Sequence, residues 1–385
     1  MSGVKNCRVA WLFPSMYQGN YWHPIFREFV SNYKQTIVYT GFWPGFAEGC
    51  EDAFAVEVVG KTTFLETGEN ASTRHNYGFI NASLNIVGRL LAFRPTVIFT
   101  SAFSIWTALA VLFKPMGRWR VAILYDGSSP TVDHQGDWFR MFARRAIAKL
   151  VDAFIANSAA AKEYLTEGLR IPVDRVFYRT YLVPDEALLL KSVQPLPLHD
   201  LKLRRPVFLF VGQIVPRKGL NFLLDACSIL KKQGCENFTL LAIGDGEQQK
   251  ALAERVRSWD LVDQVVWTGR VEYGQLGAYF KAADVFVMPT LEDVWGMVIL
   301  EAMVFGKPIL CSKWAGAAEV VVDGENGYVF EPRDPAALAA LMNQFIEQPE
   351  LCDRMGQRSK ELVARHNPDT ASRSFIDIVE AILRA

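Results

Sequence analysis

The chain alternates short apolar runs with longer segments in which apolar residues recur every three or four positions. The runs are rich in β-branched and aromatic residues, as strands are. The first six are RVAWLF (8–13), TIVYTG (36–41), FAVEVV (54–59), TVIFTS (96–101), RVAILYD (120–126) and AFIANS (153–158). Because they are apolar at nearly every position, both faces of the predicted sheet are covered, as in parallel sheets connected by helices. The pattern predicts a doubly wound α/β domain over residues 1–190.

The same alternation restarts after a proline-containing segment at residues 190–206, which reads as an interdomain linker. The second set of runs is VFLFVG (207–212), TLLAIG (239–244), VVWTG (265–269), DVFVMP (284–289), PILCS (308–312) and GYVF (327–330). A single core stops growing at roughly 250–300 residues, so 385 residues favour two domains. Ligands of such sheets bind at the carboxyl ends of the strands, and we expect the functional site in a cleft between the domains.

Composition narrows the class of protein. The 41 basic residues balance the 41 acidic ones, which removes a broad electrostatic case for nucleic acid binding. The six cysteines are scattered without metal-ligand spacing, which favours reduced thiols over a zinc or disulfide framework. The N-terminus runs directly into a strand pattern without a signal-peptide core. No run approaches the ~20 apolar residues of a membrane span. These features predict a cytoplasmic protein.

The segment TLEDVWGMVILEAMVFG (290–306) combines a strand end, a loop and a predicted helix that stops at a glycine. The N–H groups of Gly296, Met297 and Val298 open this helix and suit a phosphate. Glu301 is the one charged side chain of the helix, and a buried carboxylate needs a partner, for which ribose hydroxyls would serve. Asp293 is either an N-cap acid or a ligand contact.

A second constellation is VGQIVPRKGL (211–220), in which Arg217 and Lys218 precede Gly219 at a predicted helix start. Two cations beside free helix N–H groups would neutralise a diphosphate. The alternative is a solvated basic turn. The spacing does not match the phosphate-binding loop G-x-x-x-x-G-K-[ST].

The segment DVWGMVILEAMVFGKPIL (293–310) resembles the signature of the retaining family-4 glycosyltransferases of the GT-B fold (glycosyl transferases group 1), an acid, seven residues and a glutamate. The turns RKG, IGDGE, TGRV and GENGYVFEP are similar to those of that family and occur in its order. The resemblance covers roughly residues 204–370, and the N-terminal half matches only in architecture and in residues 152–165. It implies two Rossmann-like domains facing across a cleft, with acceptors bound by residues 1–190 and the nucleotide sugar by residues 204–368. A helix at about 369–385 would pack back on the first domain.

The resemblance also implies roles for individual residues. Arg217, Lys218 and the backbone of Gly296, Met297 and Val298 would hold the donor diphosphate, Glu301 the ribose, Asp293 the hydroxyls of the transferred sugar, and the backbone of Arg270 and Val271 the base.

Three positions depart from the family pattern. Asp293 replaces a glutamate, and Gln213 in the donor site replaces an arginine found in many members. Asp126 follows the fifth strand where many members have a histidine, and His134 lies eight residues further on. We expect Asp126 near the reacting face of the sugar, and the alternative is an acid that caps the turn GSSP.

The implied activity is transfer of a sugar, of hexosyltransferase type, from a nucleotide diphosphate sugar to an acceptor hydroxyl with retained anomeric configuration, in polysaccharide, glycolipid or glycoconjugate synthesis. The sequence contains no Asp-x-Asp motif, consistent with a metal-independent reaction, and we expect no cofactor. One alternative is an inactive or nucleotide-binding scaffold of the same fold. A Rossmann oxidoreductase is disfavoured because no G-x-G-x-x-G follows the first strand of either domain.

Two N-terminal segments are candidates for contact with an acceptor or with a membrane. The loop after the first strand supplies Gly19, Tyr21, Trp22 and His23, whose rings could stack on a saccharide, a lipid-linked or a small-molecule acceptor. For His23 the alternative is a packing role. The helix WFRMFARRAIAKLV (138–151) is basic and amphipathic, which suits peripheral contact with the inner face of a membrane. An ordinary domain helix with a solvated basic face is the alternative.

Overall fold

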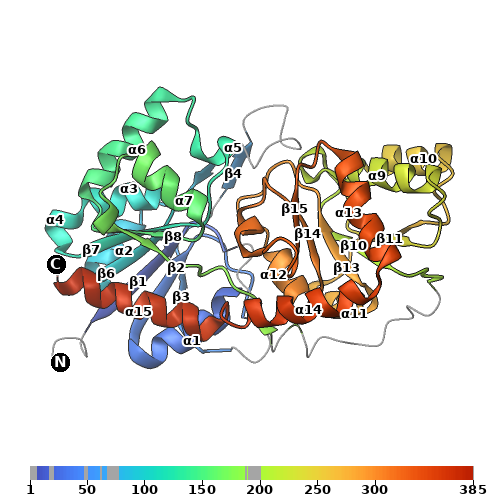
Figure 1. Cartoon of the computed structure of the whole chain (residues 1–385). Helices are drawn as coiled ribbons and strands as arrows, with labels where there is room; N and C mark the ends of the chain where they lie inside the picture. The colour runs from blue at the N-terminus through green and yellow to red at the C-terminus, as the bar shows by residue number, and fades with distance from the viewer. Residues whose placement is uncertain are drawn as a thin grey trace. The chain divides into compact units, whose positions relative to one another are not determined.

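The chain folds into two compact units (Figure 1). The computed structural model describes residues 7–16, 21–46, 51–60, 63–66, 78–186, 189 and 201–384. Over these residues, unit 1 runs to Val183 and resumes at Pro368, and unit 2 runs from Pro184 to Asn367. The unit boundary precedes the predicted linker, of which residues 190–200 lie outside the described part of the chain.

Unit 1 is built on a parallel sheet. Among the described residues its strands lie in the order β3-β2-β1-β6-β7-β8-β9, with bounds β1 (Arg8–Phe13), β2 (Gln35–Thr40), β3 (Ala55–Val58), β6 (Val97–Ser101), β7 (Arg120–Tyr125), β8 (Ala153–Ala156) and β9 (Val176–Tyr178). A separate antiparallel pair consists of β4 (Thr63–Glu66) and β5 (Gly78–Asn81). The predicted strands are confirmed. β4 (TFLE) and β5 (GFIN), each with polar or glycine ends, and the three-residue β9 do not stand out in the apolar pattern.

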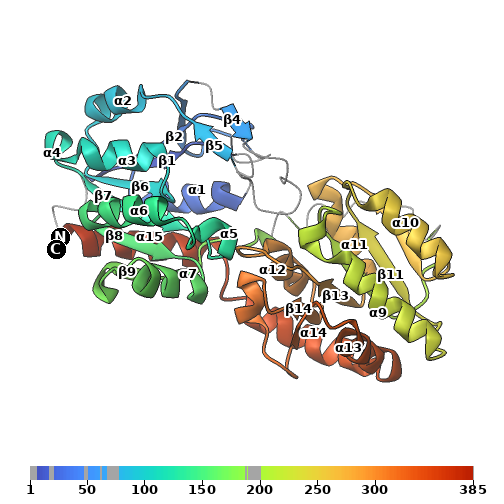
Figure 2. The ribbon, with the colours of Figure 1, turned by 90° about the horizontal axis from the view of Figure 1, so that it is seen from above.

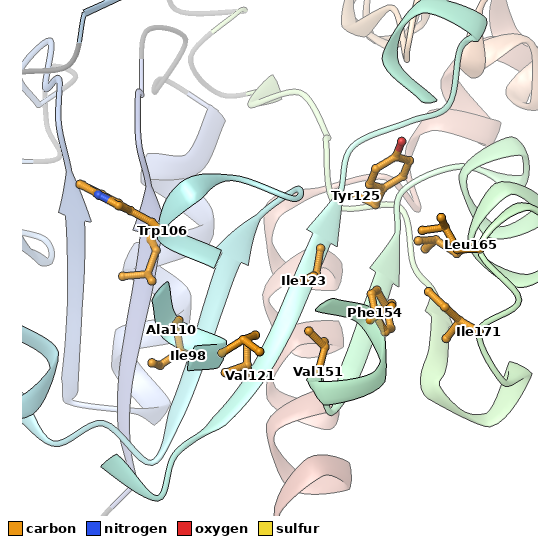
Figure 3. Packing of buried hydrophobic residues seen from close by; sticks show 14 of the residues in the cluster. Ile98, Trp106, Ala110, Val121, Ile123, Tyr125, Val151, Phe154, Leu165 and Ile171 are labelled. Atoms are coloured by element: carbon orange, nitrogen blue, oxygen red, sulfur yellow. The ribbon is translucent and has the colours of Figure 1, made fainter. Parts of the chain in front are cut away.

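Helices cover both faces of this sheet because successive strand residues point to opposite sides. The helices of unit 1 are α1 (Trp22–Asn32), α2 (Ile86–Phe93), α3 (Ile105–Leu112), α4 (Lys114–Gly117), α5 (Pro130–Asp133), α6 (Trp138–Leu150), α7 (Ala159–Glu163) and α15 (Pro368–Arg384). Ala10 and Leu12 of β1 pack in the core beneath α2, α3 and α6, part of which Figure 3 shows. Trp11 faces the opposite core, where α1 and α15 lie side by side (Figure 1).

Unit 2 repeats this architecture with strand order β12-β11-β10-β13-β14-β15, all parallel among the described residues. The strands are β10 (Val207–Val211), β11 (Thr239–Ile243), β12 (Val265–Gly269), β13 (Val285–Met288), β14 (Ile309–Ser312) and β15 (Gly327–Phe330). The helices are α9 (Leu220–Lys232), α10 (Gln249–Ser258), α11 (Leu276–Ala282), α12 (Met297–Val304), α13 (Pro335–Glu347) and α14 (Glu350–Val363).

Two helical layers enclose the sheet of unit 2. On one face α9 and α13 pack against each other (Figure 2), over a core that includes Val285 and Val287 of β13. Phe286 points to the other face, where its ring lies 6.1 Å from that of Phe280 in α11. In the described part of the chain, no helix is long and apolar enough to span a membrane.

Candidate functional site

The turn that carries Arg217 and Lys218 lies against the chain that leaves β13. β10 and β13 are parallel neighbours, so their carboxyl ends share one edge of the sheet. Gly219 has φ +68°, and a Cβ at this position would lie 2.0 Å from the carbonyl oxygen of Pro289. The backbone N–H of Leu291 donates to the carbonyl of Arg217 at 2.7 Å. The close approach therefore requires glycine and fixes both cations beside the loop after β13.

The two cations have different partners. The Lys218 ammonium donates to the carboxylate of Asp293, and the two side chains are only 16% and 11% exposed. Arg217 donates from Nη2 to Oε1 of Gln213 at 3.3 Å. Its Nη1 is buried and has no hydrogen-bond partner among the described residues. A buried guanidinium nitrogen without a partner suits an anionic oxygen.

Asp293 belongs to the loop between β13 and α12 and does not cap the helix. Its backbone N–H donates to the carbonyl of Trp314 at 3.1 Å, and its own carbonyl accepts from the N–H of Gly316 at 3.0 Å. The loop is therefore held on the segment that follows β14, and the carboxylate points to Lys218.

The amino end of α12 is open to a ligand. Gly296 occupies the N-cap with φ +96°, where a Cβ would lie 2.9 Å from the terminal methyl of Met288. Within the described residues no side chain caps this end. The first N–H groups of a helix have no intrahelical acceptor, so those of Met297 and Val298 can bind an anion.

Glu301 is buried on α12, as its apolar surroundings in the sequence predict. It is 5% exposed and accepts a hydrogen bond from the Tyr273 hydroxyl at 3.1 Å. Burial raises the pKa of its carboxyl to about 7, and the bond from Tyr273 opposes the rise. Tyr273 follows β12 in the same loop as Arg270, which is exposed, and Val271, which is half-buried.

Asp126 follows β7 in unit 1 and is exposed to solvent. Its carboxylate accepts a hydrogen bond of 2.6 Å from the hydroxyl of Tyr181. His134 ends α5 and contacts Nη1 of Arg140 at 2.8 Å. Burial and the nearby guanidinium groups of Arg140 and Arg144 lower the pKa of His134 to about 4, so the imidazole is neutral at physiological pH.

A buried polar network beneath the Asp126 loop was not predicted. Asp133, only 2% exposed, accepts hydrogen bonds from the hydroxyls of Ser128 and, at 2.7 Å, Tyr125. Arg144 donates to the Asp133 carbonyl at 2.9 Å and to the Tyr164 hydroxyl at 2.7 Å. Arg144 therefore points into unit 1 instead of covering a solvated face. In the sequence, Asp133 and Arg144 are two charged residues 11 positions apart, and no motif indicates that they meet.

The predicted acceptor residues are not gathered at the surface. Gly19 lies outside the described residues, and Tyr21 is half-buried. Trp22 and His23 are 7% and 0% exposed, and His23 packs among the rings of Trp43, Phe46 and Phe54. Desolvation lowers the pKa of His23 to about 4. The structure thus places Trp22 and His23 in the core of unit 1, which corrects the expectation that their rings face an acceptor.

The exposed face of α6 is aromatic at its start. Trp138, Phe139 and Phe142 are 78%, 65% and 67% exposed. Arg145 and Lys149 are also exposed and follow on the same side of the helix. The inward side carries Met141 and Arg144, together with Arg140. The helix is therefore apolar outward in its first turns and cationic outward in its later ones.

Comparisons with known proteins relate the second half of the chain to a family. Residues 198–362 match the family model of the glycosyl transferases group 1. The D-inositol 3-phosphate glycosyltransferase of Streptomyces avermitilis is 30% identical over 46% of this chain and 40% of its own length. The alpha-D-kanosaminyltransferase of Streptomyces kanamyceticus is 27% identical over 57% of this chain and 59% of its own. The chain thus spans about half the length of these curated relatives.

Solved structures resemble the whole chain. Anabaena HepE in complex with UDP has a TM-score of 0.72 at 18% identity, over 97% of this chain and 100% of that one. A glycosyltransferase of Rickettsia africae has a TM-score of 0.76 at 14% identity, over 98% and 99%. Likeness at this identity shows the fold, and the predicted GT-B class with two Rossmann-like domains is confirmed. Residues 198–362, in a chain of this fold, belong to the glycosyl transferases group 1 family.

Proposed function

We propose that the protein transfers a sugar, as a hexosyltransferase, from a nucleotide diphosphate sugar to an acceptor hydroxyl. One observation carries the proposal. Within the segment that matches the family model, the turn of Arg217 and Lys218 is hydrogen-bonded to the loop that leads into α12, whose amino end is uncapped by side chains and which carries the buried Glu301. Cations and helix N–H groups suit a diphosphate. The buried carboxylate of Glu301, about one helical turn further along α12, suits ribose hydroxyls.

In this proposal, different residues of unit 2 bind the diphosphate, the ribose, the base and the sugar of the nucleotide sugar. Arg217 and Lys218 bind the diphosphate with the N–H groups of Met297 and Val298, and Gln213 orients Arg217 through their hydrogen bond. Glu301 accepts from the ribose, steadied by Tyr273. The backbone at residues 270–271 holds the base, and Asp293 accepts from hydroxyls of the transferred sugar.

The chemistry follows from charge. Breaking the bond between the sugar and the diphosphate places negative charge on the leaving group, which the two cations and the positive end of α12 stabilise. These groups supply the charge that a metal supplies in other transferases, and we infer a metal-independent reaction without a cofactor. Asp126 stabilises the positive charge that develops on the sugar. The acceptor hydroxyl forms its bond to the anomeric carbon on the face that the diphosphate leaves and gives its proton to the departing diphosphate, so the anomeric configuration is retained.

We infer that the acceptor is a saccharide, a lipid-linked compound or a small molecule, used in polysaccharide, glycolipid or glycoconjugate synthesis. The matched relatives carry names that differ in acceptor, an inositol phosphate for one and glycogen for another. The family model matches only residues 198–362, which supports donor binding by unit 2 and leaves the acceptor to unit 1.

We further infer a cytoplasmic protein that contacts the inner face of a membrane through residues 138–151. Trp138, Phe139 and Phe142 form an exposed aromatic face on α6, and Arg145 and Lys149 continue it. Aromatic rings enter the headgroup region, and neighbouring cations attract anionic lipids. The face contains no acidic residue, which favours an anionic lipid surface over other partners.

Vesicle sedimentation tests the membrane contact. Binding to phosphatidylglycerol vesicles should exceed binding to phosphatidylcholine vesicles, and Trp138→Ala with Phe142→Ala should reduce it at least several-fold. Val262→Ala, which alters an exposed apolar residue of unit 2, is the matched control. Equal sedimentation of the double variant and the control would rule out α6 as the contact.

Donor binding and turnover test the main proposal. UDP-glucose, GDP-mannose and ADP-glucose are screened by thermal shift, followed by assays of sugar transfer and donor hydrolysis. We expect one donor to stabilise the protein and to turn over, and Lys218→Ala and Glu301→Ala to weaken its binding by at least tenfold. Donor binding without turnover would favour the scaffold alternative, and the absence of binding to any nucleotide sugar would reject the donor site.

A further inference from the structure

Tyr181 lies where the chain leaves unit 1. Val183 is the last residue of unit 1 before the chain enters unit 2. Tyr181 is fully buried, and its hydroxyl donates to Asp126 at 2.6 Å. The first connection between the units therefore starts two residues after a side chain that holds Asp126.

Asn157 fixes the backbone at this point. Its Oδ1 accepts hydrogen bonds from the N–H groups of Tyr181 and Leu182, at 2.8 and 2.9 Å. The backbone N–H of Asn157 donates to the carbonyl of Tyr125, the residue before Asp126, at 3.1 Å. One fully buried asparagine thus joins the ends of β7 and β8 to the segment after β9. The hydrogen bond from the Tyr181 hydroxyl to Asp126 completes a ring of contacts that also includes Asn157 and the backbone of Tyr125.

The helix that follows the second connection packs against the same tyrosine. The chain re-enters unit 1 at Pro368, where α15 begins. Two turns later, the ring of Phe375 lies 5.5 Å from that of Tyr181. Trp22 packs against Tyr181 at 5.7 Å. The segment before the first connection therefore supplies the Tyr181 ring, whose hydroxyl donates to Asp126, and the helix after the second connection packs against this ring.

We propose that Tyr181 is a positioning residue that orients Asp126 for sugar transfer and ties that orientation to both connections between the units. The inference rests on the proposed function of Asp126. Enzymes of two domains commonly close on their substrates, and hinge residues absorb the change. Because Tyr181 holds the Asp126 carboxylate and lies two residues before the first connection, the carboxylate reaches its working orientation only when the connections between the units adopt theirs. Trp22 and Phe375 then contribute as the packing that fixes the ring.

Tyr181→Phe in the full chain tests the proposal, because it keeps the ring and removes the hydroxyl. We expect kcat for the donor that turns over in the wild type to fall about 10- to 100-fold. The Kd for UDP and the melting temperature should stay as in Tyr33→Phe. That control removes another buried tyrosine hydroxyl of unit 1, one without a hydrogen-bond partner among the described residues.

The pH profile separates positioning from a merely structural effect. Asp126 is exposed at the surface, but neighbouring protein still desolvates part of its carboxyl and raises its pKa, and the hydrogen bond from the Tyr181 hydroxyl opposes this rise. Removing the hydroxyl should therefore raise this pKa and move the acid limb of kcat to higher pH. An unchanged kcat and acid limb in Tyr181→Phe would overturn the inference. Full activity of Asp126→Asn, or no turnover by the wild type, would instead reject the proposed function.

Discussion

At the scale of single residues, the ion pair between Lys218 and Asp293 changes how both can act. A diphosphate that binds Lys218 must compete with the Asp293 carboxylate, since both attract the same ammonium. Once phosphate oxygens take the ammonium, the carboxylate can accept from sugar hydroxyls. Aspartate in place of the family glutamate is compatible with this double use, because the loop holds its backbone on the segment after β14.

Asp293→Asn should therefore affect nucleotide and sugar in opposite directions. Loss of the negative charge frees Lys218, and the affinity for the nucleoside diphosphate of the donor that turns over should rise by up to about tenfold. Sugar transfer should fall at least a hundredfold, since an amide is a weaker acceptor for hydroxyls than a carboxylate. Isothermal titration with this nucleotide and initial-rate assays measure the two effects. Weaker binding of the nucleotide would instead mean that Asp293 mainly holds Lys218 in place.

The buried Glu301 predicts a pH dependence of donor binding. Its pKa of about 7 means that protonation competes with hydrogen bonds from the ribose, which favour the ionised form. Affinity for the donor sugar should rise by about tenfold between about pH 6 and about pH 8, as the free carboxyl loses its proton. Nucleotide sugars suit this titration because their diphosphate does not ionise in that range. Glu301→Gln should bind more weakly, with a flat profile, and a slope that survived in this variant would assign the titration elsewhere.

Residue patterns along the chain could identify only part of this site. Glu301 stands out because it is the one charge in an apolar helix, and Arg217 and Lys218 because they precede a glycine. Tyr273, which bonds Glu301, is 28 residues away in sequence, and Tyr181 is 55 residues from Asp126. Such pairs are set by which strand ends meet at one edge of a sheet, and spacing along the chain does not carry that information.

At the scale of elements, α6 shows how a correct helix prediction can leave its orientation open. The pattern of residues 138–151 predicts an amphipathic helix, and the natural expectation turns its arginines to solvent. The structure turns Arg144 inward because the Asp133 carbonyl and the Tyr164 hydroxyl offer it buried acceptors. The aromatic residues are left outside. Buried polar partners decided the rotation of the helix, and they come from α5 and from the turn after α7, 11 and 20 residues from Arg144 in sequence.

The C-terminal helix gives a prediction at the same scale. α15 follows unit 2 in the chain but supplies Phe375 to the aromatic cluster of unit 1, with its ring 5.0 Å from that of Trp11. Phe375→Ala should destabilise the protein by about 3–5 kcal/mol, through lost burial and the cavity left behind. Urea unfolding followed by tryptophan fluorescence measures the loss. Arg373→Ala on the exposed side of α15 should change little, and equal stability of both variants would contradict the packing of α15 in unit 1.

At the scale of the whole molecule, the two units have different proposed roles. The groups assigned to the donor all lie in unit 2, whereas Asp126 lies in unit 1. The alternation of strands and helices predicts two domains, because it stops and restarts at a proline-containing segment. The family resemblance implies that the chain returns to unit 1 after completing unit 2, whereas the residue pattern alone shows only one more amphipathic helix. Its place is fixed by the apolar surface that α1 and the first sheet leave for it.

Separate cores predict two unfolding transitions with different responses. The nucleoside diphosphate of the donor that turns over, at about 100 times its Kd, should stabilise the unit that binds it by about 2.7 kcal/mol, because a ligand that binds only the folded form stabilises that form. If the donor-binding residues act as proposed, this nucleotide raises the transition of unit 2 and leaves that of unit 1 in place, whereas Phe375→Ala lowers the transition of unit 1. Scanning calorimetry of the wild type and of this variant, each with and without the nucleotide, measures both transitions. A single transition raised by the nucleotide in both proteins would mean that the connections couple the units so tightly that they unfold as one, and would contradict independent unfolding of the two units.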